Sequence, residues 1–341
     1  MSLEWEDWRM TDVANLDDRA PTVAVLIPCY NEALTVRAVV ERFAASLPGA
    51  RVFVYDNNST DGTALAAAAS GAVVRNVPLQ GKGNVIHRMF ADVDADVYVL
   101  VDGDGTYDAA LAPTLVRGVV EDGLDMVCGA RVSFDDDAFR TGHKFGNRFL
   151  TGVVRGIFGR QFQDMLTGYR ALSRRFVKSF PAHSGGFEVE TELTVHALQM
   201  RLPSAEIETA YGARPDGSSS KLNTFRDGVR ILLMIGLLVR DERPLPFFGL
   251  IGALALLTGA ALAAPVLIHY LHTGLVPRYP TLIVSVGAGL IALLSFVCGL
   301  VLDTVSRARL EQRRLAYLAL PGPGARQSTK ARGHETVSPN V

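Results

Sequence analysis

The stretch YVLVDGDGTYD, Tyr98 to Asp108, brings an apolar run directly to two carboxylates. The run V-Y-V-L-V has the length and the β-branched content of a buried strand. It is followed by Asp102 and Asp104, one residue apart, with a glycine after each. Carboxylates at this spacing can meet one hard cation, and glycines allow a sharp turn beside a bulky ligand. A turn capped by aspartates would have the same sequence, so the pattern alone leaves both interpretations open.

Further strand and helix patterns precede this stretch. Short apolar runs at 23–27, 51–55 and 72–77 alternate with segments that have apolar residues at helical spacing. Asn31 is placed to cap the first of these helices, over 33–43. Strands that alternate with helices predict an α/β fold, with a mainly parallel sheet covered on both faces. In such sheets ligands bind beyond the carboxyl ends of the strands, and three polar segments fall there: PCYNE, DNNSTDGT and DGDG.

Composition and motif spacing exclude several classes of protein. The 341 residues carry a formal net charge of −1, so no basic excess is available and we expect no binding of nucleic acid. The three cysteines form no C-x-x-C pair, which favours reduced, structural thiols. The first strand is not followed by G-x-G-x-x-G, and GKGN at 81–84 lacks the spacing of a Walker loop. A dinucleotide-dependent oxidoreductase and an NTPase are therefore disfavoured.

Two long apolar segments lie near the C-terminus. Within 246–303, residues from about 247 to 271 and from about 280 to 302 are nearly free of charge. Each is long enough to cross a hydrocarbon core about 30 Å thick, so we expect two transmembrane helices; a buried hairpin of a soluble protein is the alternative. Arginines flank the pair on both outer sides, whereas the turn between them contains only Arg278. The positive-inside rule then predicts a multi-pass membrane protein whose N-terminal part and C-terminus are both cytoplasmic.

The rest of the chain divides by composition. Residues 1–20 form an acidic segment, 21–222 the α/β domain, and 304–341 a tail that begins basic and then lacks apolar periodicity, as disordered segments do. Residues 139–160 interleave basic and apolar side chains without any acid, which favours a helix in the membrane interface over an ordinary surface helix. Residues 223–243 predict a second, juxtamembrane amphipathic helix.

Four segments carry a resemblance to a known family. PCYNE (28–32), DNNSTDGT (56–63), GKGN (81–84) and DGDG (102–105) resemble, in order and spacing, the motifs of family 2 glycosyltransferases with the GT-A fold. The resemblance implies a metal-dependent hexosyltransferase that uses a nucleotide-diphosphate sugar, either a UDP-sugar or a GDP-sugar. It also implies that the two carboxylates of DGDG hold Mg²⁺ or Mn²⁺ against the diphosphate.

The same resemblance implies which residues bind the donor nucleotide. Asp56 would bind the base, and the 28–32 loop would line the nucleotide pocket. The whole set comprises Pro28, Tyr30, Asn31, Glu32, Asp56, Asn58, Lys82 and Asp102. The family commonly has D-D-x-S after the second strand, whereas this chain has Asp56-Asn57-Asn58-Ser59, so the resemblance assigns no role to Asn57.

Later segments are similar to one branch of the family, the polyprenyl-phosphate glycosyltransferases. They are GAR (129–131), QDMLTGYR (163–170), GGFEVETEL (185–193) and RPDGSSSKL (214–222). That branch includes dolichol-phosphate mannose synthases and bacterial enzymes with two C-terminal membrane helices, which implies a bacterial-type inner (plasma) membrane and a polyprenyl phosphate acceptor. In the archaeal-type synthase a glutamine two residues beyond D-x-D joins the metal site; here that position is Thr106.

The acceptor determines which side chains the reaction needs. A hydroxyl needs a base to remove its proton, whereas a lipid phosphate is already ionised and can attack the anomeric carbon directly, with inversion. Arginines suit such a phosphate because the guanidinium binds it through two hydrogen bonds. The candidates for the acceptor phosphate are Arg131 and Arg148, with Arg214 and Lys221 at the rim of the pocket.

Catalytic roles are therefore expected for Asp104, Arg131 and Asp164. Asp164 lies where inverting relatives with hydroxyl acceptors have their base; with a phosphate acceptor we interpret it as a positioning group. The alternative function is transfer to a lipid or saccharide hydroxyl with Asp164 as general base. Glu188 and Glu190, two residues apart, are open to structural pairing or to sugar contact. The oligomeric state is also open, and a homo-oligomer is among the alternatives.

Overall fold

The computed structural model describes residues 20–132, 162, 164–181, 185–186, 188–212, 236–237, 239–241 and 243–323. The chain divides into two compact units. The first consists of Met1–Lys221 together with Ala316–Val341, and the second of Leu222–Leu315.

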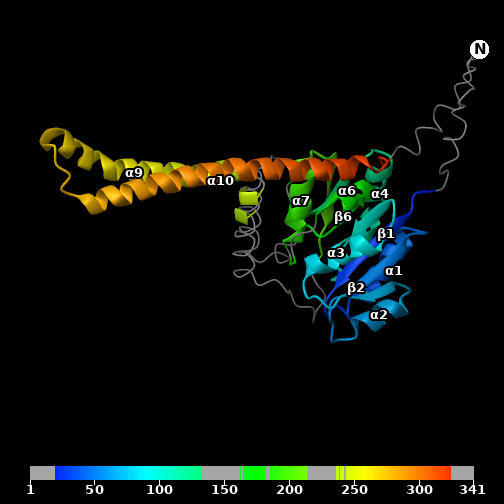
Figure 1. Ribbon diagram of the computed structural model, residues 1–341. Helices are drawn as coiled ribbons and strands as arrows, with labels where there is room; N and C mark the ends of the chain where they lie inside the picture. Colours follow the sequence, from blue (N-terminus) through cyan, green and yellow to red (C-terminus); the bar gives the residue numbers. More distant parts are fainter. Residues whose placement is uncertain are drawn as a thin grey trace, which may run out of the picture. The chain divides into compact units, whose positions relative to one another are not determined.

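A seven-stranded sheet, in the order β3-β2-β1-β4-β6-β5-β7, forms the centre of the first unit (Figure 1). Neighbours pair in parallel except β6, which runs antiparallel to β4 and to β5. The mainly parallel α/β fold expected from the sequence is thus confirmed. The strands are β1 (Val23–Cys29), β2 (Arg51–Asp56), β3 (Val73–Asn76), β4 (Val97–Leu100), β5 (Met126–Val132), β6 (Arg170–Ser173) and β7 (Ser204–Ala210).

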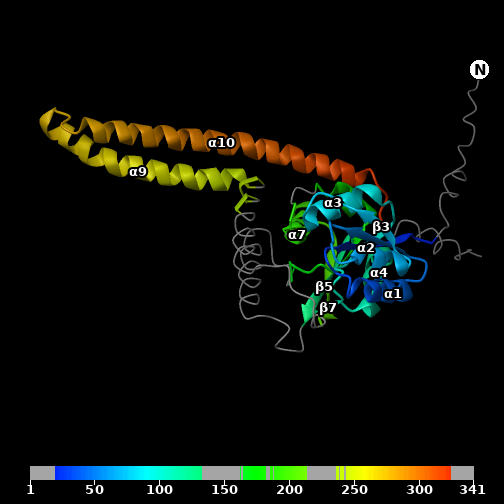
Figure 2. The same ribbon diagram turned by 90° about the horizontal axis from the view of Figure 1, so that it is seen from below.

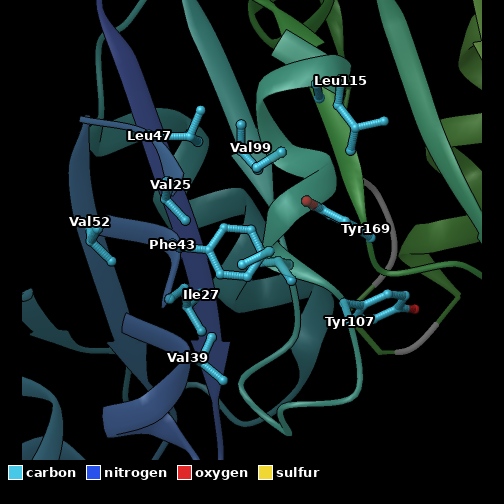
Figure 3. Packing of buried hydrophobic residues seen from close by; sticks show 14 of the residues in the cluster. Val25, Ile27, Val39, Phe43, Leu47, Val52, Val99, Tyr107, Leu115 and Tyr169 are labelled. Atoms are coloured by element: carbon cyan, nitrogen blue, oxygen red, sulfur yellow. The ribbon is translucent and has the colours of Figure 1, made fainter. Parts of the chain in front are cut away.

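Helices cover both faces of this sheet, which explains why its central strands are apolar without interruption. On one face, Val25 and Ile27 of β1 pack against Phe43 of α1 (Figure 3). On the other, the ring of Tyr98 in β4 meets Phe90 of α3 edge to face, with 6.2 Å between the ring centroids. Figure 2 shows α1 and α4 on one side of the sheet and α3 on the other. The helices of this unit are α1 (Val36–Ser46), α2 (Thr63–Ala69), α3 (Lys82–Asp92), η1 (Ala109–Leu111), α4 (Ala112–Val120), α6 (Arg174–Ser179) and α7 (Val189–Met200).

The expected start of the first helix is wrong. The helix begins at Val36 with Thr35 in the cap position, so Asn31 is not its cap. Asn31 has a positive φ of 54°, and its side-chain oxygen accepts a hydrogen bond from the amide of Thr60 at 2.8 Å. A hydrogen bond to a distant loop replaces the local cap that the sequence predicted.

A C-terminal segment belongs to the first unit and completes a buried polar cluster there. The carboxylate of Asp125 is fully buried. It accepts hydrogen bonds from the Ser173 hydroxyl at 2.7 Å, from Arg175 Nε at 2.6 Å and from the Tyr317 hydroxyl at 2.7 Å. The guanidinium of Arg175 also lies over the Tyr317 ring, 4.5 Å from its centroid. Because a buried carboxylate is stable only when its hydrogen bonds are satisfied, Tyr317 contributes to the stability of this unit.

The second unit contains the long helix α9 (Pro244–Thr273) and, as far as Leu315, the long helix α10 (Tyr279–Leu318). Both are long and apolar enough to cross a membrane. They contact each other through small residues seven positions apart, Gly252 and Gly259 on α9 and Ser285, Ala292 and Gly299 on α10. A Cβ on Gly259 would lie only 3.1 Å from the Ser285 carbonyl oxygen. Close approach of the two backbones therefore requires small side chains along this seam.

Candidate active site

Acidic side chains converge at the carboxyl ends of β1, β2 and β4. The register of β1 and β2 sets Cys29 beside Asp56, and DGDG follows β4, which pairs with the other edge of β1. Burial raises the pKa of the Cys29 thiol, and the charges of Glu32, Asp56, Asp102 and Asp104 raise it further. Acids from three loops therefore lie near Cys29 at this edge of the sheet, as the strand pattern predicted.

The loops after β1 and β2 are joined by hydrogen bonds. Three consecutive amides donate to side chains of the second loop: Asn31 to Ser59 Oγ at 2.8 Å, Glu32 to Thr63 Oγ1 at 2.8 Å and Ala33 to Asp61 Oδ2 at 3.0 Å. The polar residues of DNNSTDGT thus satisfy backbone donors that would otherwise lack partners at the end of a strand. They hold the 28–32 loop, expected to line the nucleotide pocket, against the second loop; in it Tyr30 is 40% exposed and Pro28 is half-buried.

Asn57, to which the sequence assigned no role, organises the next loop. Its Nδ2 donates to the carbonyls of Val77 and Leu79 at 2.8 and 2.9 Å, and its Oδ1 accepts from the Gly81 amide at 2.7 Å. A carboxylate cannot donate these two hydrogen bonds, so an amide is required here. The side chain of Asn58 is also used in this loop, where it donates to the Pro78 carbonyl at 2.9 Å.

Asp56 retains an acceptor that the described part of the chain does not satisfy. The residue is 5% exposed, and its Oδ2 accepts from the Ser59 amide at 3.1 Å. Its Oδ1 is buried and has no hydrogen-bond partner among the residues that the structure describes. Because an unpaired buried acceptor is costly, this oxygen indicates a ligand that donates a hydrogen bond.

The two aspartates of DGDG have different environments. Asp104 is 3% exposed, and its Oδ1 accepts from the Thr106 hydroxyl at 2.6 Å and from the Thr106 amide at 3.1 Å. The Oδ1 of Asp102 lies 2.5 Å from Lys82 Nζ. Gly168 lies against the Asp102 carboxylate so closely that a Cβ there would be 2.8 Å from Cγ.

Lys82 also brings Glu190 into the site. Its Nζ lies 2.5 Å from Glu190 Oε1, on the first turn of α7. Burial works to lower the pKa of Lys82, but Asp102 and Glu190 outweigh it and hold that pKa above its ordinary value. The sequence left Glu190 open between structural pairing and sugar contact; its place in GGFEVETEL was the available signal.

The donor set at this edge fits a divalent cation shared with a ligand. Asp102 and Asp104 supply two carboxylates, and within the described ranges no group of three or more His, Cys, Asp or Glu could enclose a metal ion. Mg²⁺ typically binds through one or two carboxylates together with substrate phosphates. The residues present therefore fit a cation whose coordination shell a diphosphate completes.

Arg131 and Asp164 form a second charged pair, at the carboxyl end of β5. Nε of Arg131 donates to Oδ2 of Asp164 at 2.6 Å, and Nη2 donates to Oδ1 at 2.8 Å. Burial works to lower the pKa of Arg131, but the hydrogen bonds and charge of Asp164 help to hold that pKa well above its ordinary value. The guanidinium also lies over the ring of Tyr211, 5.4 Å from its centroid.

Arg170, which the sequence did not single out, holds the segment around Asp164 to α7. It is fully buried, and its Nη2 donates to the carbonyls of Met165 and Glu190, both at 2.9 Å. A buried guanidinium with several carbonyl acceptors fixes those backbone segments relative to each other. Arg148, Arg214, Lys221 and the expected interface helix at 139–160 lie outside the described residues, as does most of 223–243.

Comparisons with known proteins show that the chain is similar to glycosyltransferases. Residues 24–180 match the model of a family described as glycosyl transferase family 2. The chain is 35% identical over 243 residues to the glycosyltransferase AglJ of Haloferax volcanii, covering 71% of this chain and 80% of that protein. It is 23% identical over 208 residues to the dolichol-phosphate mannosyltransferase of Pyrococcus furiosus, covering 58% of each.

A solved structure shares the fold. The glucosyl-3-phosphoglycerate synthase of Mycobacterium tuberculosis, in complex with Mn²⁺, UDP and glucosyl-3-phosphoglycerate, superposes with a TM-score of 0.53. The two sequences are 26% identical, and the match covers 63% of this chain and 80% of that one. The sheet described above is thus a GT-A fold.

Proposed function

We propose that this chain, which belongs to glycosyl transferase family 2, is an inverting enzyme. It would transfer a hexose from a nucleoside-diphosphate sugar to a membrane polyprenyl phosphate. One observation supports the binding of a nucleoside-diphosphate sugar: an unpaired buried acceptor and a pair of carboxylates lie at the same edge of the sheet. Asp56 supplies the acceptor, and Asp102 and Asp104 supply the pair.

The donor nucleotide is proposed to bind through its base and its diphosphate. Asp56 Oδ1 lacks a hydrogen-bond donor among the described residues, and either the imide N–H of uracil or the ring N–H of guanine could supply one. A UDP-sugar and a GDP-sugar therefore both fit. Asp102 and Asp104 would hold Mg²⁺ or Mn²⁺, which supplies positive charge to the diphosphate as the glycosidic bond breaks. Pro28, Tyr30, Asn31 and Glu32 would border the nucleotide, in the loop that the 56–63 segment fixes.

The acceptor is proposed to be a lipid phosphate held by arginines. An ionised phosphate needs no base, and Arg131 already engages the carboxylate of Asp164, the candidate base. Arg131, with Arg148, Arg214 and Lys221, would bind that phosphate and lower the repulsion between it and the donor diphosphate. The Pyrococcus furiosus relative, named a dolichol-phosphate mannosyltransferase, supports this acceptor class.

The proposed location is a bacterial-type inner membrane. The two apolar helices α9 and α10 could span it, and a membrane would place a long-chain lipid phosphate within reach of the enzyme. The excess of arginines outside the apolar pair would put the catalytic unit and the C-terminus in the cytoplasm.

Transfer to a hydroxyl is the second candidate function. The Mycobacterium tuberculosis synthase was also solved with Mn²⁺, UDP-glucose and phosphoglyceric acid, and that structure is 25% identical to this chain with a TM-score of 0.54. In this case Asp164 would serve as the base, and the hydrogen bonds that it accepts from Arg131 would have to break first.

The deciding experiment tests labelled donors one at a time. Purified protein with Mg²⁺ or Mn²⁺ and polyprenyl phosphate is given UDP-glucose, UDP-galactose, UDP-N-acetylhexosamines or GDP-mannose. We expect one donor to yield an organic-soluble lipid that mild acid cleaves, and Asp104→Ala to abolish that product. Donor hydrolysis without labelled lipid would instead indicate a hydroxyl acceptor.

A further inference from the structure

We propose that Lys82 competes with the divalent cation for Asp102, and that its ammonium group shifts to Glu190 when metal and nucleoside diphosphate bind together. The inference rests on the proposed function, because it takes Asp102 to be a metal ligand. It adds a coupling between two ligands: the metal ion alone should bind weakly, and the metal ion should bind more tightly when the nucleoside diphosphate is also bound. It also makes Lys82 and Glu190 positioning residues of the donor site.

The ammonium group of Lys82 lies between two carboxylates. Lys82 is the first residue of α3, and its Nζ is 2.5 Å from Asp102 Oδ1 and 2.5 Å from Glu190 Oε1. The side chains of Lys82 and Glu190 are only 10% and 9% exposed. A charge buried to this extent is stable only when it is paired, so the ammonium stays with at least one of these partners.

A cation that approaches Asp102 therefore meets a positive charge already bound there. One oxygen of Asp102, Oδ1, contacts Lys82. The other, Oδ2, lies against Gly168, where even a Cβ would collide with it. Two positive charges on one carboxylate repel each other, so an entering metal ion gains full access only when the ammonium withdraws.

Glu190 offers the ammonium a second position. It lies on the first turn of α7, and its carbonyl accepts from the buried Arg170 at 2.9 Å, which holds that turn in place. When Lys82 leaves Asp102 it keeps its contact with Glu190, so no buried charge is left unpaired. The diphosphate brings the negative charge that then recruits the metal to Asp102 and Asp104. Metal and diphosphate are thus expected to bind with positive coupling.

Direct binding of Mn²⁺, followed by the EPR signal of the free ion, tests the competition without an activity assay. For the purified full-length protein we expect weak Mn²⁺ binding alone and binding at least about tenfold tighter with saturating UDP or GDP. In Lys82→Gln the competing charge is absent, so Mn²⁺ alone should bind about tenfold tighter than in the wild type. The gain from nucleotide should shrink accordingly.

A matched control separates this effect from a general change in charge. Arg88→Gln removes the same charge from the same helix, at a side chain that is 62% exposed and paired with Asp92. It should leave Mn²⁺ binding unchanged. Glu190→Gln provides a second test if Lys82→Gln does not fold. Without the carboxylate of Glu190 the ammonium remains on Asp102, so Mn²⁺ binding in the presence of nucleotide should weaken about tenfold.

The outcomes distinguish this inference from the proposed function. If Lys82→Gln binds Mn²⁺ alone no more tightly than the wild type, while Mn²⁺ and nucleotide still bind together, the competition is overturned and the donor site stands. If neither UDP nor GDP promotes Mn²⁺ binding to the wild type, the metal–diphosphate site is overturned, and the competition with it.

Discussion

Arg131 binds both carboxylate oxygens of Asp164, with Nε donating to Oδ2 at 2.6 Å and Nη2 donating to Oδ1 at 2.8 Å. The Arg131 amide adds a third hydrogen bond at 3.2 Å. Both oxygens of this carboxylate are thus occupied by Arg131, and they could reach a substrate hydroxyl only if these hydrogen bonds broke. The same pair aligns the guanidinium at the end of β5. The geometry therefore favours a positioning role for Asp164 over that of a general base.

Asp164→Asn tests this role. Loss of a true general base costs about 10²–10⁴-fold in rate. Because a phosphate acceptor needs no base, we expect transfer to polyprenyl phosphate to fall by less than about 100-fold, with an unchanged pH profile. Asp164→Ala is the comparison, and it should lose more because it leaves the Arg131 guanidinium without any side-chain acceptor at this position, whereas Asn keeps one oxygen. No activity from a folded Asn variant that still binds donor would point to a base and a hydroxyl acceptor.

Asn57→Asp should destabilise the protein although the two side chains have the same shape. The change removes both donors to the Val77 and Leu79 carbonyls and sets a negative charge against them. We expect a loss of about 2 kcal/mol or more in the free energy of unfolding, with weaker nucleotide binding. Thermal unfolding in detergent and UDP titration measure the two effects. The control is Asn58→Asp, at an exposed position, which should change stability less; equal stability of the Asn57 variant and the wild type would refute the assigned role.

Gly168→Ala should impair the metal site without unfolding the protein. The new Cβ would lie 2.8 Å from Cγ of Asp102 and so must displace that carboxylate. We expect Mn²⁺-dependent UDP binding to weaken about tenfold or more, because metal ligands must be held within about 0.5 Å of their working geometry. Gly212→Ala is the control: its Cβ would have 3.8 Å to the nearest atom outside its chain neighbours, the Thr106 carbonyl oxygen. Binding unchanged in both variants would show that Asp102 does not need its observed position.

The stability of the Asp61→Ala variant should depend less on pH in the acid range than the stability of the wild type does. Partial burial works to raise the pKa of Asp61, but hydrogen bonds from the Thr63 hydroxyl and from the Ala33 and Thr63 amides outweigh it, so the pKa is lowered from 3.8. A lowered pKa in the folded state means that the charged carboxylate stabilises the protein above pH 3.8 and that this contribution is lost as the pH falls through the folded value. The wild type should unfold at a higher temperature than the variant at pH 7, and the difference should vanish well below pH 3.8. A difference that is constant over this range would contradict the assignment.

Gly259→Leu should separate the two apolar helices. A Cβ at this position would lie 3.1 Å from the Ser285 carbonyl oxygen and 3.2 Å from the Cβ of Ala288, so a larger side chain cannot fit without displacing α10. Overpacking of this kind costs about 1–3 kcal/mol, which should lower the unfolding temperature of the detergent-solubilised protein. Gly287→Leu provides the control, because nothing lies within 4 Å of its Cβ. Equal effects of the two substitutions would mean that the seam does not hold the helices together.

Local pattern was enough to predict the elements of the fold. The apolar runs at 23–27 and 97–101 predicted central strands, and β1 and β4 are buried on both faces. Polar segments at strand ends predicted one edge for the site, and the acids of three loops converge there. These predictions succeeded because hydrophobic periodicity and strand direction are properties of short segments.

Side-chain partners could not be predicted in this way. Asn31 was expected to cap a helix and instead binds Thr60 in another loop. The requirement for an amide at Asn57 depends on carbonyls about 20 residues away, at Val77 and Leu79. Neither partner is visible in the local pattern, because each hydrogen bond joins loops that only the sheet brings together.

The sequence by itself determined the α/β class, the two long apolar helices and the position of the polar loops at the carboxyl ends of the strands. Only the tertiary structure decided that Lys82 lies between Asp102 and Glu190, and that Arg131 binds Asp164 through both oxygens. Periodicity reports which face of an element is buried, because burial follows the local alternation of apolar and polar residues. The partner of a charged side chain depends on which strand ends and helix starts meet at one edge, and that is a property of the whole sheet.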